Sequence, residues 1–477
     1  MTSRRVAAVA AAFLLTGCTS FADTVAERGR PPAADPAPTP AAEDQGCPAE
    51  RAEPDPDRPE VSLDFVLADD GRSVTGTETV VFTPDLDVDE LVFRLVPNGP
   101  DSAPAGNRLL VDDVRGDDVA GGRYEGAGAA DPGGLYVVEL EDELAAGEST
   151  EVELAFSLAL GSGGFDRFGV DGPASWWASG APLLAWEPGA GWARDPFVAL
   201  SGETASSPVA DTEVSVSVPE DLTVLMTGAV AEPGAPRDGR RTWTSTEPVA
   251  RDVAVAVGPF TTTEATTAGG TRVTTGVLPD PDLPGEELSA WTVAAVDDLE
   301  ALLGPFPYDT LSVALLPDFG GGIEYPSMIL EATPSRMVLV HEVAHQWFYG
   351  MVGNSQFRDP WLDEAFASWA EAVVDPGSGL VSEAALDLEG PVGAAMDQYE
   401  SSGRYFRLVY DKGGSALLEA QRAVGDQAFT AAIRCYVDAT AWSIATPDDV
   451  HRAMADLPAA VDVLRAAGAL DAEDAGG

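Results

Sequence analysis

The sequence predicts a multidomain protein in which an all-β N-terminal half is followed by a mixed α and β half that ends in helices. Two observations predict this fold class. Between residues 60 and 260, apolar and polar residues alternate in short segments broken by Gly, Pro and Asp, whereas beyond residue 333 the periodicity is mainly helical. At 477 residues the chain is long enough for two or three domains with cores of their own.

The N-terminus has the pattern of an export signal. Arg4 and Arg5 precede an apolar run at 6–15 that is too short to span a bilayer. The sequence Leu-Thr-Gly-Cys that follows resembles a bacterial lipoprotein box, in which the cysteine, Cys18, is lipidated after cleavage. We therefore expect a signal peptide in residues 1–18 and an extracytoplasmic protein anchored to the cell membrane by lipid. Ordinary secretion with an incidental Cys18 is the alternative.

Residues 19–59 are rich in Pro, Ala, Asp and Glu, a composition that buries too little apolar surface to fold, so we expect a disordered tether. Residues 60–260 are expected to form an all-β domain of antiparallel sheets. Its clearest period-two segments are 61–68, 73–82, 90–96, 134–141, 150–160, 212–218 and 251–260. This region holds no histidine, so we expect it to support chemistry located elsewhere.

Residues 261–477 form the second predicted domain. Its expected elements begin with a strand at 271–278, a helix at 285–303, a strand at 311–316 and a glycine-rich segment at 319–326. Thr333 and Asp359 are each followed by proline, so we expect each to cap a helix whose first residue is that proline.

The charge of the chain limits its partners. A net charge of −52 repels nucleic acid phosphates and anionic lipid headgroups, which excludes nucleic acid as a partner and favours metal ions and basic peptides.

Besides Cys18, the chain has Cys47 and Cys435. In an oxidising compartment these two residues form either one disulfide or two free buried thiols.

The sequence His-Glu-Val-Ala-His at 341–345 carries the clearest chemistry. On a helix, His341 and His345 project from one face and can bind one metal ion together. Glu342 is rotated about 100° from His341, so it lies beside the ion as a general base for a metal-bound water. A core helix with two satisfied histidines is the alternative. The third histidine, His451, lies in a polar stretch and is expected on a helix surface.

Catalytic zinc needs a third protein ligand, and the candidates are carboxylates because no other histidine is near. Glu364 follows His345 after eighteen intervening residues, within the sequence WLDEAFASW. This pattern resembles the aminopeptidase N family of zinc peptidases, the gluzincins, in which the motif is HExxH-x18-E. The resemblance implies one zinc ion bound by His341, His345 and Glu364, with Glu342 as the base.

Two further segments resemble motifs of the same family. The segment Gly-Gly-Ile-Glu-Tyr at 321–325 is similar to the G-[AG]-M-E-N motif, with Tyr325 in place of the usual Asn. The resemblance implies that Glu324 holds the substrate's α-amino group, and that Gly321 and Gly322 let the peptide approach the backbone. The segment VYDKGGSAL is similar to VYEKGA, which implies that Tyr410 stabilises the oxyanion.

The segment VYDKGGSAL also contains the chain's only lysine, Lys412, which suggests a position that does not accept arginine. For the acid or glutamine that the family's β domain supplies to the amine pocket, the nearest candidate is Glu187.

The resemblance covers roughly residues 60–470 and implies that the second domain is a thermolysin-like α+β zinc-peptidase domain. Long family members carry a further helical domain, which is missing here, so the chain resembles the short bacterial members. We expect an aminopeptidase that acts on peptide substrates. The alternatives are a zinc peptidase of broader or internal specificity and an inactive surface-binding lipoprotein. The sequence leaves the oligomeric state open.

Overall fold

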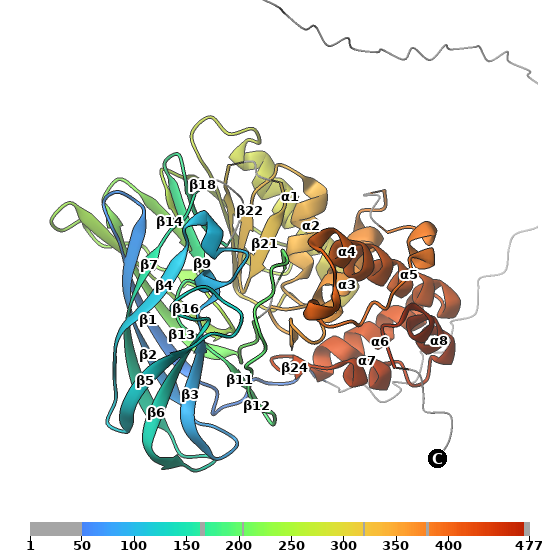
Figure 1. The fold of residues 1–477 in the computed structure, drawn as a ribbon. Coiled ribbons are helices and arrows are strands. Elements are labelled where there is room, and N and C mark those ends of the chain that lie inside the picture. Colours follow the sequence, from blue (N-terminus) through green and yellow to red (C-terminus); the bar gives the residue numbers. More distant parts are fainter. Residues whose placement is uncertain (1–49, 163–166, 203–204, 318–319, 378–380, 472–477) are drawn as a thin grey trace, which may run out of the picture. The chain divides into compact units, whose positions relative to one another are not determined.

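Strands fill the first half of the chain and helices fill its last part in the computed structural model (Figure 1). The structure describes residues 50–162, 167–202, 205–317, 320–377 and 381–471, all within the unit Cys47–Gly477. The predicted signal peptide, Cys18, Cys47 and most of the predicted tether lie outside these residues. The expected order of strands before helices is confirmed, and the boundary near residue 260 stays a prediction.

The largest sheet has seven strands in the order β15-β16-β13-β1-β2-β7-β4. Their alternating sequences bury one face, as in β7, where every second side chain lies in the core. The strands are β1 (Glu60–Leu67), β2 (Ser73–Phe82), β4 (Arg108–Arg115), β7 (Thr150–Ala159), β13 (Ala210–Pro219), β15 (Ala229–Val230) and β16 (Arg240–Ala250). All neighbours are antiparallel except β1 and β13, which run parallel. The predicted antiparallel character of this half is confirmed, with this one parallel pair.

Two smaller sheets complete the β half, with the orders β10-β3-β6-β5 and β14-β17-β9-β8. The first contains β3 (Val88–Arg94), β5 (Val119–Glu125), β6 (Leu135–Leu144) and β10 (Leu183–Leu184). The second contains β8 (Phe168–Asp171), β9 (Ala174–Ala178), β14 (Thr223–Met226) and β17 (Ala254–Gly258). A short hairpin pairs β11 (Trp186–Glu187) with β12 (Gly191–Trp192), and two short 3-10 turns, η1 (Val96–Asn98) and η2 (Ala103–Ala105), follow β3.

The five-stranded sheet that follows has the order β18-β19-β20-β22-β21. Its inner pairs are parallel and its two edge strands are antiparallel. The strands are β18 (Thr261–Thr266), β19 (Arg272–Val277), β20 (Thr310–Leu315), β21 (Gly322–Tyr325) and β22 (Met328–Glu331). Helix α1 (Gly285–Leu303) packs on β18 and β19, and α2 (Arg336–Ala344) packs on β21 and β22. The predicted helix at 285–303 and the two predicted strands are confirmed.

An apolar cluster joins the sheet that contains β9 and β17 to the five-stranded sheet. Trp176 and Ala256 from the first sheet pack with Ala314, Ile323 and Leu330 from the second. In Figure 1 the five-stranded sheet and α2 lie between the strands of the first half and the C-terminal helices. Strand β21 therefore faces both the β half and the helical part of the molecule.

The two helices of the predicted metal site start later than expected. Ser335, and not Thr333, caps α2, because its side chain accepts a hydrogen bond from the Val338 amide. Helix α3 (Trp361–Val374) begins at the residue after Pro360, and proline has no side chain able to cap it.

The remaining helices are α4 (Ser402–Phe406), η5 (Arg407–Lys412), α5 (Gly413–Val424), α6 (Asp426–Ala439), α7 (Pro447–Ala453) and α8 (Pro458–Ala467). Two short turns, η3 (Glu383–Asp387) and η4 (Met396–Gln398), and one strand pair, β23 (Gly353–Asn354) and β24 (Ile444–Ala445), complete this part of the chain.

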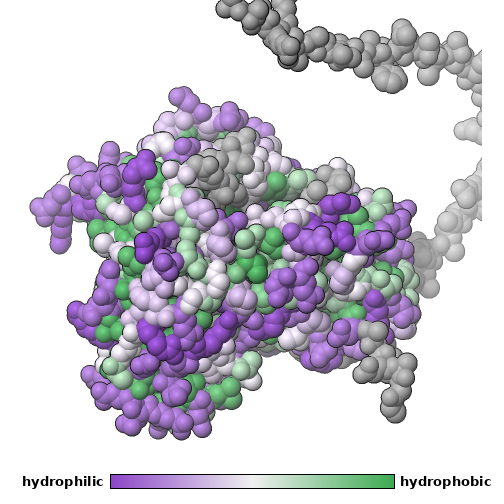
Figure 2. Space-filling model, in the orientation of Figure 1, coloured by the Kyte–Doolittle hydropathy of each residue, from purple (hydrophilic) through white to green (hydrophobic). Residues whose placement is uncertain are grey.

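The molecular surface is mainly polar. Figure 2 shows hydrophilic residues over most of one face, with apolar residues in small scattered patches. Among the described residues, the large hydrophobic side chains that are exposed are Val66, Leu86 and Phe406. No helix among the described residues is long and apolar enough to cross a membrane.

Cys435 is disulfide-bonded, which excludes a free thiol at that position.

Candidate active site

The metal-binding sequence lies at the end of α2. His341 and Glu342 occupy its last turns, and His345 is the residue that terminates it. All three side chains are buried. The helix ends here because the chain turns back at Tyr349, whose φ is 104°, and the amide of Gly350 bonds the carbonyl of His345. The two imidazoles therefore meet at the base of a cleft.

The nitrogen and oxygen atoms of His341, His345 and Glu364 lie at the spacing that a tetrahedral metal ion requires. The Nε2 atoms of the two histidines are 3.1 Å apart. Glu364 Oε2, on the first turn of α3, is 3.2 Å from His341 Nε2 and 3.3 Å from His345 Nε2. Ligands about 2.0–2.1 Å from one tetrahedral zinc ion are roughly 3.3 Å from each other. The three residues therefore fit one zinc ion.

A second layer of contacts orients both imidazoles. His345 Nδ1 lies 3.0 Å from the carbonyl oxygen of Phe348, and His341 Nδ1 lies 3.5 Å from Oε2 of Glu371. Such partners fix the tautomer of a ligating histidine, because they accept the proton on Nδ1 and leave Nε2 for the metal. Glu371 is two turns beyond Glu364 on α3 and was missed in the sequence, although its i+7 spacing places it on the same helix face.

The pKa values of the two glutamates of the site, Glu342 and Glu364, are shifted in opposite directions. Burial and the negative charge of Glu324 raise the pKa of Glu342 to about 8. Burial alone would also raise the pKa of Glu364, but the charges and hydrogen bonds of His345 and His341 hold it below its usual range. Glu364 thus stays ionised as a ligand would, and Glu342 has one oxygen, Oε2, without a protein partner.

Tyr410 reaches the site from a distorted helix. Its ring stacks on His341 at a centroid distance of 5.7 Å, and its hydroxyl donates a hydrogen bond to Glu364 Oε1. Tyr410 lies in the π-helical turn η5, between α4 and α5. π-helical turns widen a helix locally and often occur at functional sites. The turn places Tyr410 beside the metal ligands.

Lys412 ends the π-helical turn and is buried. Its ammonium donates to the carbonyls of Leu388, at 2.9 Å, and Gly390, at 2.7 Å. A compact point charge fits between two carbonyl oxygens better than the larger planar guanidinium of arginine. This geometry accounts for a lysine at this position in a chain that otherwise uses arginine.

Strand β21 carries the glycine-rich motif along the cleft. Gly321, just before the strand, has a φ of 104°, a conformation that favours glycine. Glu324 is buried, and one of its oxygens lies within 4.8 Å of a ligand atom of both Glu342 and His345. The motif therefore lies mainly on an edge strand, and it brings Glu324 next to His345 and Glu342.

Gly322 is required by the position of Glu342. A Cβ atom at Gly322 would lie 2.5 Å from Cγ of Glu342, closer than any real contact. We expect Gly322→Ala to displace the Glu342 carboxylate and to lower kcat by about 10–10²-fold, since misplacing a reacting group by about 1 Å has effects of this size. Steady-state kinetics and a thermal unfolding curve check this. Gly121→Ala is the control, because a Cβ there meets nothing within 4 Å, and equal activity of both variants would contradict the prediction.

The cleft that contains these residues encloses about 1320 Å³ of empty space, its open mouth included. It is lined by every residue predicted for the site: Gly321, Gly322, Glu324, His341, Glu342, His345, Glu364 and Tyr410. The lining residues that the sequence did not indicate include Asp101 and Arg167, from distant segments, and the exposed Phe406, four residues before Tyr410.

Two residues considered in the sequence lie elsewhere. Glu187 is not among the residues that line the cleft, and its carboxylate instead accepts a hydrogen bond from Arg358. His451 lies on α7 with its Nε2 3.3 Å from the guanidinium of Arg465, as expected for a residue outside the site.

Comparison with known sequences finds a family similarity in the second half of the chain. The Peptidase family M1 domain matches residues 323–466. Aminopeptidase M1-B of Oryza sativa subsp. japonica is 25% identical over 233 residues, which are 42% of this chain and 26% of the rice protein. Probable aminopeptidase 2 of Sulfurisphaera tokodaii is 29% identical over 129 residues, 24% of this chain and 16% of that protein. The matched segments are thus a minor part of these relatives.

Solved structures share the fold over most of the chain. The M1 zinc metallopeptidase from Deinococcus radiodurans superposes with a TM-score of 0.64 at 20% sequence identity, covering 86% of this chain and 93% of that one. The structure of a mutant of that enzyme bound to a Tyr-Ser-Ala substrate superposes with a TM-score of 0.65 at 19% sequence identity. The superposition covers 87% of this chain and 95% of that one. This likeness confirms the fold class. Residues 323–466 are therefore similar to the peptidase family M1 domain, which supports the predicted resemblance to the aminopeptidase N family.

Proposed function

We propose that the protein is a zinc-dependent aminopeptidase that removes N-terminal residues from peptides. One observation carries the proposal: a single cleft holds a His-His-Glu group at tetrahedral spacing together with Glu342, Glu324 and Tyr410. Metal-assisted hydrolysis needs a metal site, a base and an oxyanion donor, and trimming from the amino end needs a carboxylate for the ammonium group. All four are present within one cleft.

His341, His345 and Glu364 would hold the zinc ion. When bound there, zinc supplies a Lewis acid that polarises the scissile carbonyl and lowers the pKa of a water molecule to about 7. Family M1 is a family of zinc peptidases, so one zinc ion is the expected cofactor. The partners in the cleft supply the remaining chemistry.

Glu342 is the proposed general base. Its carboxylate lies beside the metal ligands, and its Oε2 atom has no protein partner that would compete for a proton. It takes a proton from the attacking water and passes it to the amine that leaves. Because Gly322 has no side chain, it leaves the space that the Glu342 side chain occupies.

Tyr410 is the proposed oxyanion donor. Its hydroxyl already points at the metal site, where it donates to Glu364. A hydroxyl in this place can turn to donate to the carbonyl oxygen as that atom becomes negative, an interaction typically worth 10²–10³ in rate.

Glu324 is the proposed contact for the substrate's α-ammonium group. A buried carboxylate and an ammonium ion form a strong, charge-assisted hydrogen bond. Because β21 is the edge strand of its sheet, its free backbone edge can also align an extended peptide, and Gly321 and Gly322 leave room for it.

The proposal is tested with one peptide in two forms, with a free and with an acetylated N-terminus. An aminopeptidase cleaves the free form and leaves the acetylated form almost intact, because acetylation removes the charge that Glu324 binds. Equal turnover of both forms would instead indicate a peptidase of broader or internal specificity. Purified protein that neither contains zinc nor gains activity when zinc is added would support an inactive binding protein.

We further propose that the protein is extracytoplasmic and held at the cell membrane by a lipid on Cys18. The basis is the sequence from Arg4 to Cys18, which resembles a lipoprotein signal. Metabolic labelling with a radioactive fatty acid tests this. Label should appear in the wild-type protein and be absent from Cys18→Ala, and equal labelling of the two proteins would exclude the anchor.

A further inference from the structure

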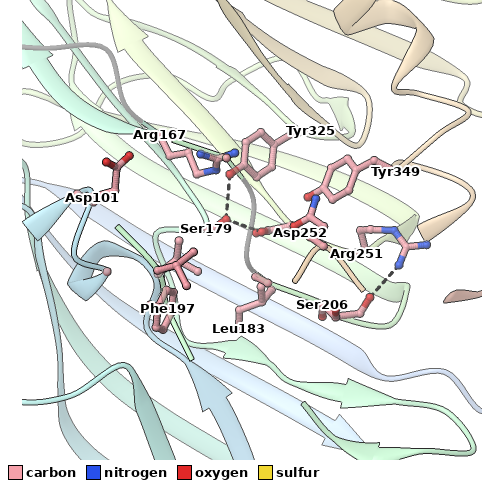
Figure 3. A pocket seen from close by; sticks show the side chains of 18 of the residues that line it. Asp101, Arg167, Ser179, Leu183, Phe197, Ser206, Arg251, Asp252, Tyr325 and Tyr349 are labelled. Carbon is pink, nitrogen blue, oxygen red and sulfur yellow. Dashed lines mark hydrogen bonds between the residues drawn. The ribbon is translucent and has the colours of Figure 1, made fainter. Parts of the chain in front are cut away.

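A chain of hydrogen bonds links the amine-binding strand to the β half of the molecule. The hydroxyls of Tyr325 and Ser179 lie 2.9 Å apart, and Ser179 Oγ donates to Asp252 Oδ2 at 2.5 Å (Figure 3). Because the serine proton points to the carboxylate, the tyrosine must donate to the serine oxygen. The chain therefore runs in one direction, from Tyr325 through Ser179 to Asp252.

The three residues come from three segments that meet beside the cleft. Tyr325 ends β21, Ser179 follows β9, and Asp252 precedes β17. Together with Glu324 they line a cavity of about 760 Å³, its mouth included. This cavity shares Asp101, Arg167 and Glu324 with the zinc cleft, so the two spaces adjoin at the amine-binding carboxylate.

Strand β21 is also hydrogen-bonded to the segment that follows α2. Gln346, the residue after His345, donates from Nε2 to the carbonyl of Tyr325 at 3.1 Å and accepts from the amide of Ser327 at 2.9 Å. The backbone of Tyr325 is thus fixed to the metal site and its hydroxyl to the β half. Glu324 is the residue that precedes Tyr325 on the same strand.

Ser179 has a strained backbone conformation. Its φ is 52°, in the left-handed region that residues other than glycine seldom adopt. Such strain persists only where the surroundings impose it, and it concentrates at functional sites. A glycine would adopt this conformation without strain, so the serine is explained by its hydroxyl and not by its backbone.

We propose that Tyr325 and Ser179, backed by Asp252, are positioning residues that hold the Glu324 carboxylate where the substrate's α-ammonium group binds. This inference rests on the aminopeptidase function proposed above. The ammonium contact exists in both the bound substrate and the transition state. Loosening it therefore raises KM and leaves kcat nearly unchanged.

The test uses Tyr325→Phe, Ser179→Gly and the double variant, with aminoacyl reporter substrates. Each single variant should raise KM roughly three- to tenfold, the effect of one lost hydrogen bond, with kcat within about twofold of wild type. The double variant should be no worse than the single ones, because either change breaks the same chain. Ser179→Gly should also unfold at or above the wild-type temperature, since it removes backbone strain.

Tyr124→Phe is the matched control. Its hydroxyl bonds the backbone of Val111 in the β half, away from the cleft, so KM should not change. A fall in unfolding temperature with an unchanged KM in Tyr325→Phe would overturn the inference, because it would indicate a purely structural hydrogen bond. An additive double variant would overturn it as well.

Failure of this inference differs from failure of the proposed function. If the wild type cleaves free and acetylated peptides equally, the aminopeptidase proposal fails whatever the variants do, and the inference falls with it. If the wild type requires a free amine and Tyr325→Phe keeps the wild-type KM, only the positioning role is rejected.

Discussion

Glu342→Gln should lower kcat by about 10²–10⁴-fold, the usual contribution of a general base, while the protein keeps its zinc. The amide has nearly the shape of the carboxylate, so it fits the same space beside Gly322, but it cannot accept the proton of the attacking water. The metal is retained because the ligand atoms belong to His341, His345 and Glu364. Turnover of an aminoacyl reporter and the zinc content of the same sample check both parts.

Glu331→Gln provides a matched control for this experiment. Glu331 is a buried glutamate on β22 that is not among the residues lining the cleft. Burial and the nearby charge of Glu342 raise its pKa well above the usual range, and glutamine keeps the size of the side chain, so we expect Glu331→Gln to retain activity. Wild-type activity in Glu342→Gln would show that the base is misassigned, and loss of zinc would make Glu342 a ligand.

Glu364→Gln should weaken zinc binding by more than 100-fold and abolish activity at ordinary zinc concentrations. A neutral amide replaces the charged ligand, and the two imidazoles alone leave the ion incompletely held. A ligand that binds only the folded state raises the unfolding temperature. Adding zinc should therefore raise the unfolding temperature of the wild-type protein and have much less effect on the variant. Zinc titration against a competing chelator gives the affinity directly.

Glu371→Gln provides an intermediate zinc affinity with which the effect of Glu364→Gln can be compared. Glu371 touches His341 on the side away from the metal, and changes to such partners typically cost 10–100-fold in affinity. The expected order of zinc affinity is wild type, then Glu371→Gln, then Glu364→Gln. Equal affinity of Glu364→Gln and wild type would remove Glu364 from the ligand set.

The two candidate histidine ligands could be predicted from the sequence because helical periodicity is a local property. Residues four apart on one helix must share a face, so His341 and His345 were expected to bind one ion before any tertiary contact was known. Glu364 needed the resemblance to a family, since no spacing rule relates residues on different helices. The same holds for Glu324 and Tyr410, which the fold brings to the cleft from a strand and from a π-helical turn.

Contacts between distant segments could not be predicted. Ser179 and Asp252 lie in the β half and carry no motif, yet Ser179 bonds Tyr325 across 146 residues of sequence. Glu187 was chosen for its sequence neighbourhood, and it pairs with Arg358 instead. The cap of α2 was misplaced by two residues because Thr333 and Ser335 are equally good caps by composition, and only the backbone path selects between them.

The burial of Lys412 has a practical consequence. The chain has one lysine side chain, 6% exposed, with its amine hydrogen-bonded to two backbone carbonyls. Amine-reactive reagents should therefore leave the side chains of the folded protein unmodified, apart from any free chain terminus. A label at Lys412, detected by peptide mass spectrometry, would appear only when the helical part of the molecule opens. This single side-chain amine is a natural reporter of unfolding, two residues from Tyr410.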